Sequence, residues 1–283
     1  LTDCYWVTYP NDQKTFAEVN LFDNRFSQVL SQIAFTGYGS SPASKFRSSP
    51  EFTTNGMLPK AWRRKEGKVL LYKGGTSGLA NTGKEPYSEF YAAQVAEAMG
   101  IPHVTYGLSK WKGQLCSTCE LFTSKDISFV PASTLIRTSR ISQIIDWFDD
   151  HGWKNDLADM LVLDAIIRNT DRHLGNFGFL VDNHTNQLLR PAPIFDNGLS
   201  LYCYVMDNDL NNLAEQEKTL APALYANFDE VALHVIGQKQ KQELRHLLTF
   251  KFKKHSRYNL SDERIKMLES AIQGKVRCLL ESA

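Results

Sequence analysis

The 283-residue chain has few cysteines, little net charge and no long apolar run. Its five cysteines are scattered, and such an odd, sparse set does not build a disulfide framework, so we expect a reducing cytoplasm. A formal net charge of +1 gives no overall field that would attract nucleic acid. No segment has the length of a membrane span, and no signal peptide is recognisable. These absences predict a cytoplasmic protein that binds neither a membrane nor, directly, nucleic acid.

Two local patterns interrupt this even composition. Arg63, Arg64 and Lys65 form a basic cluster, which we interpret as a solvated face rather than a nucleic-acid contact. Cys116 and Cys119 form an isolated C-x-x-C pair. A structural zinc site needs four ligands and no second pair is present, so the pattern favours a strand that carries two cysteines.

The order of predicted elements indicates two lobes. Expected strands cover residues 68–73, 103–108, 114–122, 177–181 and 188–195; expected helices begin near Pro86, after Ser139 as a cap, at Leu157 and after Ser261. The first part is rich in strands and the second in helices, which predicts an α+β protein. We place a nucleotide-binding lobe at residues 1–122 and a mostly helical catalytic lobe at residues 123–283.

Three polar residues have a spacing that is typical of phosphoryl transfer. Asp171 follows the buried helix, Asn176 comes five residues later, and Asp196 ends the second strand of the next pair. Protein kinases use an Asp as catalytic base, an Asn five residues later and the Asp of a D-F-G motif to hold magnesium. If the two strands form a hairpin, Asn176 and Asp196 lie side by side at its open end. Asp171 is therefore the predicted base, and Asn176 and Asp196 are the predicted Mg²⁺ ligands.

A purely structural interpretation remains open, in which Asp171 and Asn176 cap loops and residues 196–198 form a turn. Lys73 at the end of a strand and Glu89 in the following helix weigh against it. A kinase needs a strand lysine on the nucleotide phosphates, braced by a helix glutamate. Either residue alone would be surface charge, but their order relative to the aspartates favours a kinase.

Five segments between about residues 50 and 200 resemble the HipA-like serine/threonine kinases, bacterial proteins whose fold is related to protein kinases and phosphoinositide kinases. They are TTNGMLPK at 53–60, LYKGG at 71–75, EPYSE at 85–89, NTDRHLGNFG at 169–178 and PIFDNG at 193–198. The resemblance implies a two-lobed protein-kinase-like fold with ATP and Mg²⁺ as cofactors. It also implies that segment 119–122 lines the adenine, with backbone groups at Glu120 and Phe122 meeting its edge.

The same resemblance assigns a phosphate-covering loop to residues 53–60, which includes Thr53, Thr54, Asn55 and Gly56. In some family members a serine or threonine of this loop is autophosphorylated, which expels the loop and switches the kinase off; Thr53 and Thr54 are the candidates here. The chain departs from kinase patterns in two places, since its glycines follow Lys73 and Asn197 follows Asp196.

The expected function is an ATP- and Mg²⁺-dependent serine/threonine kinase, toxin-like or autoregulated, with an unidentified protein substrate and an antitoxin-type protein partner. Two alternatives stay open. Asp171 and His173 followed by Asn176 also resemble the loop of phosphoinositide kinases, so a lipid or small-molecule acceptor is possible. A pseudokinase binding module is the other. His173 is expected either to contact Asp171 or the moving phosphate, or to support the loop.

Overall fold

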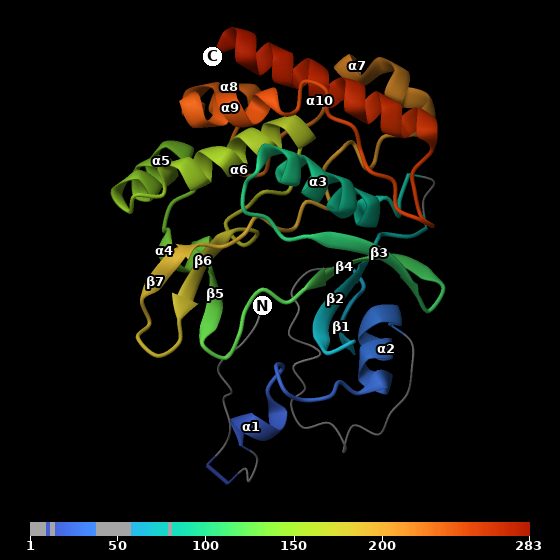
Figure 1. Cartoon of the computed structure of the whole chain (residues 1–283), viewed down its shortest axis with the longest axis vertical. Coiled ribbons are helices and arrows are strands. Elements are labelled where there is room, and N and C mark those ends of the chain that lie inside the picture. The colour runs from blue at the N-terminus through green and yellow to red at the C-terminus, as the bar shows by residue number, and fades with distance from the viewer. Residues whose placement is uncertain (1–9, 12–14, 38–57, 79–80) are drawn as a thin grey trace.

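The strands and most of the helices occupy different halves of the molecule (Figure 1), which is a computed structural model that describes residues 10–11, 15–37, 58–78 and 81–283. The strands are β1 (Lys60–Lys65), β2 (Lys68–Gly74), β3 (Tyr106–Trp111), β4 (Gln114–Glu120), β5 (Ile127–Pro131), β6 (Gly178–Asp182) and β7 (Leu188–Pro191). The helices are α1 (Phe16–Val19), α2 (Gln28–Thr36), α3 (Glu85–Met99), α4 (Ala132–Leu135), α5 (Ile141–Asp150), α6 (Lys154–Ile167), α7 (Leu213–Glu217), α8 (Phe228–Val235), α9 (Gln238–Arg245) and α10 (Asp262–Ser282), with a 3₁₀ helix at Asp207–Asn212.

The first sheet has four antiparallel strands in the order β1-β2-β4-β3. Two-residue turns join β1 to β2 and β3 to β4, and all four turn residues have positive φ: Glu66 52°, Gly67 80°, Lys112 50° and Gly113 81°. Turns with two positive φ values match the twist of paired strands, and glycine in second place makes them inexpensive. The two hairpins join through β2 and β4, whose pairing places Lys73 opposite Ser117.

Helix α3 packs between this sheet and the helical lobe. It begins with Pro86 in its first turn and ends at Gly100 with φ 78°, as predicted. Ala93 contacts the sheet side together with Tyr106, whereas Val95 belongs to the large helical core. Because α3 buries side chains on both sides, it fixes the position of the sheet relative to the helical lobe.

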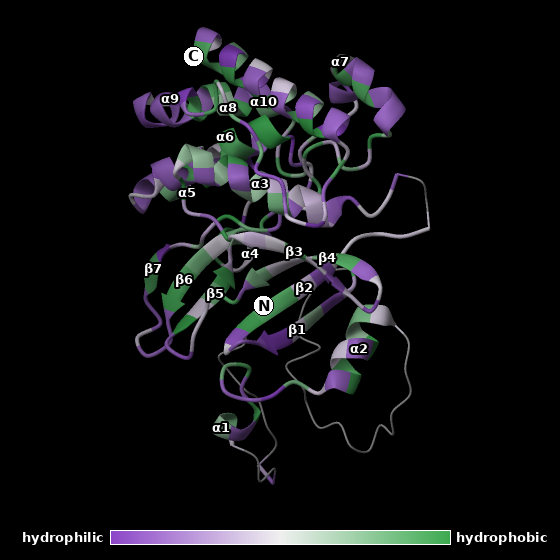
Figure 2. Cartoon of the chain, turned by 45° about the vertical axis from the view of Figure 1, so that its right-hand side comes forward, coloured by the Kyte–Doolittle hydropathy of each residue, from purple (hydrophilic) through white to green (hydrophobic). Residues whose placement is uncertain are grey.

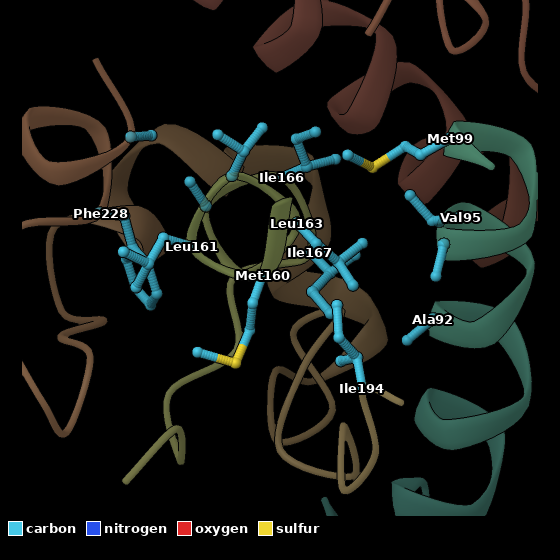
Figure 3. Close-up of a cluster of buried hydrophobic side chains, with 14 of the residues drawn as sticks. Ala92, Val95, Met99, Met160, Leu161, Leu163, Ile166, Ile167, Ile194 and Phe228 are labelled. Carbon is cyan, nitrogen blue, oxygen red and sulfur yellow. The ribbon is translucent and has the colours of Figure 1, made fainter. Parts of the chain in front are cut away.

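Helix α6 is the centre of the larger core. Figure 3 shows apolar side chains around α6, with Leu163 and Ile167 facing Val95 on α3 and Leu161 facing Phe228 on α8. A helix that is apolar all round must be buried, and every α6 residue from Leu157 to Ile167 is. In Figure 2, α6 is mostly hydrophobic, whereas the outer helix α9 is hydrophilic.

The second sheet has the order β5-β6-β7, and its strands β6 and β7 lie between the predicted site residues Asn176 and Asp196 in the chain. Gly178 at the start of β6 lies opposite Pro131 of β5. A Cβ atom at Gly178 would lie 2.1 Å from the Val130 carbonyl oxygen, so only glycine allows this approach of the two strands.

Several predicted boundaries need correction. The strand expected over 103–108 begins at Tyr106, because residues 103 and 104 instead pair with Ile194. The strand expected to reach 195 ends at Pro191, since proline at 191 and 193 cannot donate to a ladder. The helix expected to be capped by Ser139 has Arg140 at its N-cap. The strands β1 and β5 and the helix α2 were not predicted. Of the helices in the described ranges, none combines the length and apolarity needed to cross a membrane.

Candidate active site

Lys73 occupies the end of β2 and forms ion pairs with two carboxylates from other elements. Its Nζ lies 2.8 Å from Oε1 of Glu89 on α3 and also pairs with Oδ1 of Asp196, which follows β7. Lys73 and Glu89 are buried. The fold therefore brings together a strand lysine, a helix glutamate and the aspartate of the D-x-G segment, three residues that lie far apart in the sequence.

Lys73 and Asp196 each stabilise the charged form of the other. Burial by itself would lower the pKa of Lys73, but the neighbouring carboxylates of Glu89 and Asp196 outweigh it and raise the pKa well above its usual value. Burial opposes ionisation of Asp196 too, yet the charge of Lys73 holds the pKa of Asp196 below its ordinary value. At neutral pH the cluster contains an ammonium group and an ionised Asp196.

The backbone of Asp196 lies in the left-handed region, with φ 57°. A non-glycine residue rarely adopts this conformation, and it persists where the surroundings fix it. Its N–H donates to Oη of Tyr106 at 3.2 Å, and the next N–H, of Asn197, donates to Oε2 of Glu89 at 2.8 Å. Strand β3 and helix α3 thus hold the segment from two sides.

Asp171 and Asn176 lie together in the loop between α6 and β6. The Asn176 amide nitrogen donates to the Asp171 carbonyl at 2.9 Å and to Oδ2 of Asp171 at 3.4 Å. The backbone N–H of Asp171 donates to Oδ1 of Asn169 at 3.2 Å. Because the amide nitrogen of Asn176 is used within the loop, its Oδ1 is the atom that can meet a cation.

Arg172 joins the two groups of residues, and the sequence analysis did not identify it. The side chain is fully buried, and its Nη1 donates to the carbonyls of Asn176 at 2.9 Å and Phe195 at 2.7 Å. Nη1 of Arg172 therefore links Asn176, which lies two residues before β6, to Phe195, which directly precedes Asp196. This contact fixes the open end of the strand pair, where the sequence predicted that Asn176 and Asp196 meet.

Two further buried residues complete the Arg172 network. Asp164 on α6 accepts from Nε and Nη2 of Arg172 at 2.9 and 3.0 Å, and Oδ1 of Asn197 accepts from Nη2 at 2.6 Å. Asn197 also contacts Glu89, so the hydrogen bonds run without interruption from α6 to Lys73. One feature of the sequence could have indicated this network, namely Asp164 inside an otherwise apolar helix, because a buried carboxylate needs a partner.

The remaining predicted site residues have different surroundings. His173 is exposed, and its Nδ1 accepts from the Gly175 N–H at 3.0 Å, a contact within the loop. Glu120 ends β4 and pairs with Lys68 at 2.6 Å. Phe122 packs against Phe195, with ring centroids 5.6 Å apart. Thr53, Thr54, Asn55 and Gly56 lie outside the described residues. The roles of all these residues stay predictions.

The C-x-x-C pair lies in β4, as the sequence favoured. Residues three apart on a strand point to opposite faces. Cys116 packs with Phe35 and Tyr72, and Cys119 packs beside Tyr106 on the other side. Burial raises the pKa of each thiol to about 12. Among the described residues, no group of three or more His, Cys, Asp or Glu side chains is arranged to hold a metal ion.

The chain is similar to known kinases in part of its sequence and in its fold. The serine/threonine-protein kinase CtkA of Helicobacter pylori (strain J99 / ATCC 700824) is 26% identical over 132 residues, which are 41% of this chain and 40% of CtkA. The chain thus matches about two fifths of the length of this curated relative. The crystal structure of a Helicobacter pylori proinflammatory kinase CtkA has a TM-score of 0.63 at 18% identity and covers 83% of this chain and 93% of that one. The chain resembles the HipA-like kinases.

The fold predicted from the sequence, a two-lobed α+β kinase-like fold, is confirmed by the likeness to CtkA. A structure of the Shewanella oneidensis MR-1 toxin–antitoxin system HipA, HipB and its operator DNA complex has a TM-score of 0.43 at 12% identity, covering 86% of this chain and 70% of that one. That likeness is too low to compare residues or partners. No protein-family model matches the chain.

Proposed function

We propose that the chain is an ATP- and Mg²⁺-dependent serine/threonine protein kinase of HipA-like type. The observation that carries the proposal is the cluster of the buried Lys73 and Glu89 with the half-buried Asp196, joined through Arg172 to the loop that holds Asp171 and Asn176. Phosphoryl transfer is catalysed mainly by positioning and by electrostatic stabilisation of the phosphates. A buried ammonium group beside ionised and amide oxygens supplies both.

In this proposal Lys73 contacts the nucleotide phosphates and Glu89 keeps its ammonium group in place. Asn176 and Asp196 suit Mg²⁺, because amide and carboxylate oxygens are the hard ligands that this ion prefers. The ion, when bound, neutralises charge on the phosphates. Lys73 retains the contact with Glu89 at 2.8 Å if Asp196 turns toward the ion.

Asp171 is the proposed base that accepts the hydroxyl proton of the acceptor. Its carboxylate is half-buried, its N–H is fixed by Asn169, and Asn176 contacts both its carbonyl and its carboxylate. A base held in this way needs no reorganisation before it accepts a proton. Serine or threonine as acceptor is inferred from the name of CtkA, at 26% identity.

Other parts of the proposal rest on the resemblance alone. They are autophosphorylation at Thr53 or Thr54, the adenine contacts of Glu120 and Phe122, and an antitoxin-type partner. The proposed cytoplasmic location rests instead on the few, scattered cysteines. A lipid or small-molecule kinase would use the same loop, so the acceptor needs its own experiment. A pseudokinase is disfavoured because a binding module has no need of Lys73, Asp171, Asn176 and Asp196 together.

The test is phosphate transfer by the Asp171→Asn variant. General bases contribute roughly 100- to 10,000-fold in rate. We expect incorporation of labelled phosphate from ATP to fall by that factor, while nucleotide affinity stays within about 1 kcal/mol of wild type. Asp150→Asn, at an exposed position of α5, makes the same chemical change and should keep full activity. Mass spectrometry of the wild-type chain and of a lysate then identifies the acceptor. Undiminished incorporation by Asp171→Asn would contradict the assigned base.

A further inference from the structure

A pocket lies between α2 and the β1 edge of the four-stranded sheet, two elements that Figure 2 shows beside each other. Its volume is about 490 Å³. Neither Lys73 nor Asp171 lines it, so it is separate from the candidate active site. It is walled by the turn before α2, by β1 and by the β3–β4 turn. Its cations are Arg25, Arg63, Arg64 and Lys112, and two tryptophans, Trp62 and Trp111, also line it.

The lining of this pocket carries one sign of charge. Four of its side chains are cationic, and no Asp or Glu lines it among the residues that the structure describes, although the whole chain has a net charge of only +1. The nearby Asp23 is paired with Lys125. Such a concentration of one sign in a concave site attracts anions more strongly than the same charges spread over a surface.

Two of the arginines are held in place by the protein. The Arg63 guanidinium lies 4.6 Å from the ring centroid of Trp111 and 4.7 Å from that of Tyr72. The Arg64 Nη2 donates to the Phe22 carbonyl at 2.6 Å. Of the basic cluster that the sequence predicted on a solvated face, Arg64 and Lys65 are exposed, whereas Arg63 is half-buried against two rings. Stacked guanidinium groups present their N–H groups in a fixed plane, which suits phosphate oxygens.

The other part of the wall is aromatic and apolar. Trp62 is 4% exposed, and its indole Nε1 is buried without a hydrogen-bond partner among the described residues. Val29 at the rim is 50% exposed, a large apolar surface left beside the cations. The half-buried ring of Trp111 and the exposed side chain of Val29 are therefore the surfaces that a planar group of a ligand can cover.

We propose that this pocket binds a small phosphate-bearing molecule with a planar group, of the size of a mononucleotide. Its volume lies in the range of roughly 300–1,000 Å³ that is usual for small-ligand sites. Arg25, Arg63 and Lys112 bind the phosphate, and the half-buried Trp111 ring together with Val29 contacts the planar group. A single concave site favours a small ligand over a nucleic acid, whose backbone needs cations along a stripe. This inference does not depend on the proposed kinase activity.

The experiment measures binding of uridine monophosphate by isothermal titration calorimetry. Arg25 and Lys112 are exposed, so Arg25→Gln with Lys112→Gln removes two charges without disturbing the core. We expect the dissociation constant to rise roughly tenfold or more, the loss typical of charge-assisted phosphate contacts. The matched control is Lys65→Gln with Lys68→Gln, two exposed cations beside the β1–β2 turn that do not line the pocket. This control should change the constant by less than about twofold.

Four further measurements make the outcome decisive. Asp196→Ala, in the candidate active site, should leave uridine monophosphate binding unchanged. Inorganic phosphate and uridine, tested alone, should each bind more weakly than the nucleotide. The proposal is overturned by undetectable binding at millimolar nucleotide, by equal losses in both double variants, by loss in Asp196→Ala alone, or by phosphate that binds as tightly as the nucleotide. Tighter binding of an oligouridylate than of the mononucleotide would overturn the small-ligand assignment.

Discussion

At the scale of single residues, contacts with three other elements hold the backbone of Asp196 in a conformation that is unfavourable for a non-glycine residue. Its φ of 57° is unfavourable for a non-glycine residue, and three elements hold it there: β2 through Lys73, β3 through Tyr106, and α3 through the contact of Glu89 with the next N–H. Strain of this kind is retained where a side chain must point in one direction. Here that direction is toward the ammonium group of Lys73.

This placement makes Asp196→Ala a sharp test of metal binding. The variant removes the only ionised oxygen ligand of the proposed magnesium pair, so Mg²⁺-dependent ATP binding should be lost. The fold should survive, because Lys73 keeps its contact with Glu89 at 2.8 Å. Calorimetry with ATP and Mg²⁺ measures the affinity, and circular dichroism checks the fold. Asp150→Ala, at an exposed position, serves as the control. Wild-type affinity in Asp196→Ala would show that the metal assignment is wrong.

The sequence predicted those site residues whose order along the chain matches a known pattern. It did not predict those that are brought into contact only by tertiary packing. Lys73 and Glu89 follow from a strand succeeded by a helix. Arg172, Asp164 and Asn197 lie in a loop, a helix and another loop, and only tertiary packing brings them within hydrogen-bond distance. An arginine in a loop is normally exposed. Its full burial could not be inferred from local sequence.

At the scale of elements, strand β1 was not predicted, because its side chains do not show the alternating apolar pattern of a strand. The sequence of β1, KAWRRK, is mostly cationic, because it is an edge strand with one partner. Charged edge strands are common, since they discourage pairing with another chain. Helix α3 carried clear signals instead, with Pro86 in its first turn and Gly100 after its end. The sequence therefore predicted the elements that bear the site better than those at the edges.

The close approach of β5 and β6 gives a prediction about stability. In Gly178→Ala the new Cβ would lie 2.1 Å from the Val130 carbonyl oxygen, so the strands must separate. We expect the free energy of unfolding to fall by roughly 2 kcal/mol or more. Gly274→Ala is the matched control: it lies inside α10 and its Cβ meets nothing within 4 Å. Alanine should stabilise that helix by roughly 0.5–1 kcal/mol. Urea denaturation measures both changes, and a Gly178→Ala variant as stable as wild type would contradict the close packing.

At the scale of the whole molecule, one charge network links the outer helices of the helical lobe. Arg168, at the end of α6, contacts Asp229 on α8 at 2.9 Å and Glu217 on α7 at 3.1 Å. Lys275 on α10 lies 2.9 Å from Asp229. Arg168 is buried, so its partners must stay ionised to offset the cost of burying its charge. Helices α6, α7, α8 and α10 are thereby coupled through the ionisation of two carboxyl groups, those of Asp229 and Glu217.

The pH dependence of stability tests this network. Burial alone would raise the pKa of both carboxyl groups, but hydrogen bonds from Arg168 and Lys275 hold the pKa of Asp229 below its usual 3.8, and those from Tyr202 and Arg168 hold the pKa of Glu217 below its usual 4.5. The unfolded chain therefore binds more protons in acid, and the stability from these groups, complete above about pH 5, is lost as the pH falls.

Asp229→Asn removes one of the two titrating groups while Glu217 still pairs with Arg168. This variant should be less stable than wild type at neutral pH, because it loses an ion pair. It should also lose less stability than wild type between about pH 5 and about pH 3, since one fewer depressed pKa contributes to the slope. Urea unfolding at several pH values across that window measures both effects. Asp150→Asn, exposed at the end of α5, should keep the wild-type slope. If Asp229→Asn keeps the wild-type slope as well, the network does not govern the acid sensitivity of the fold.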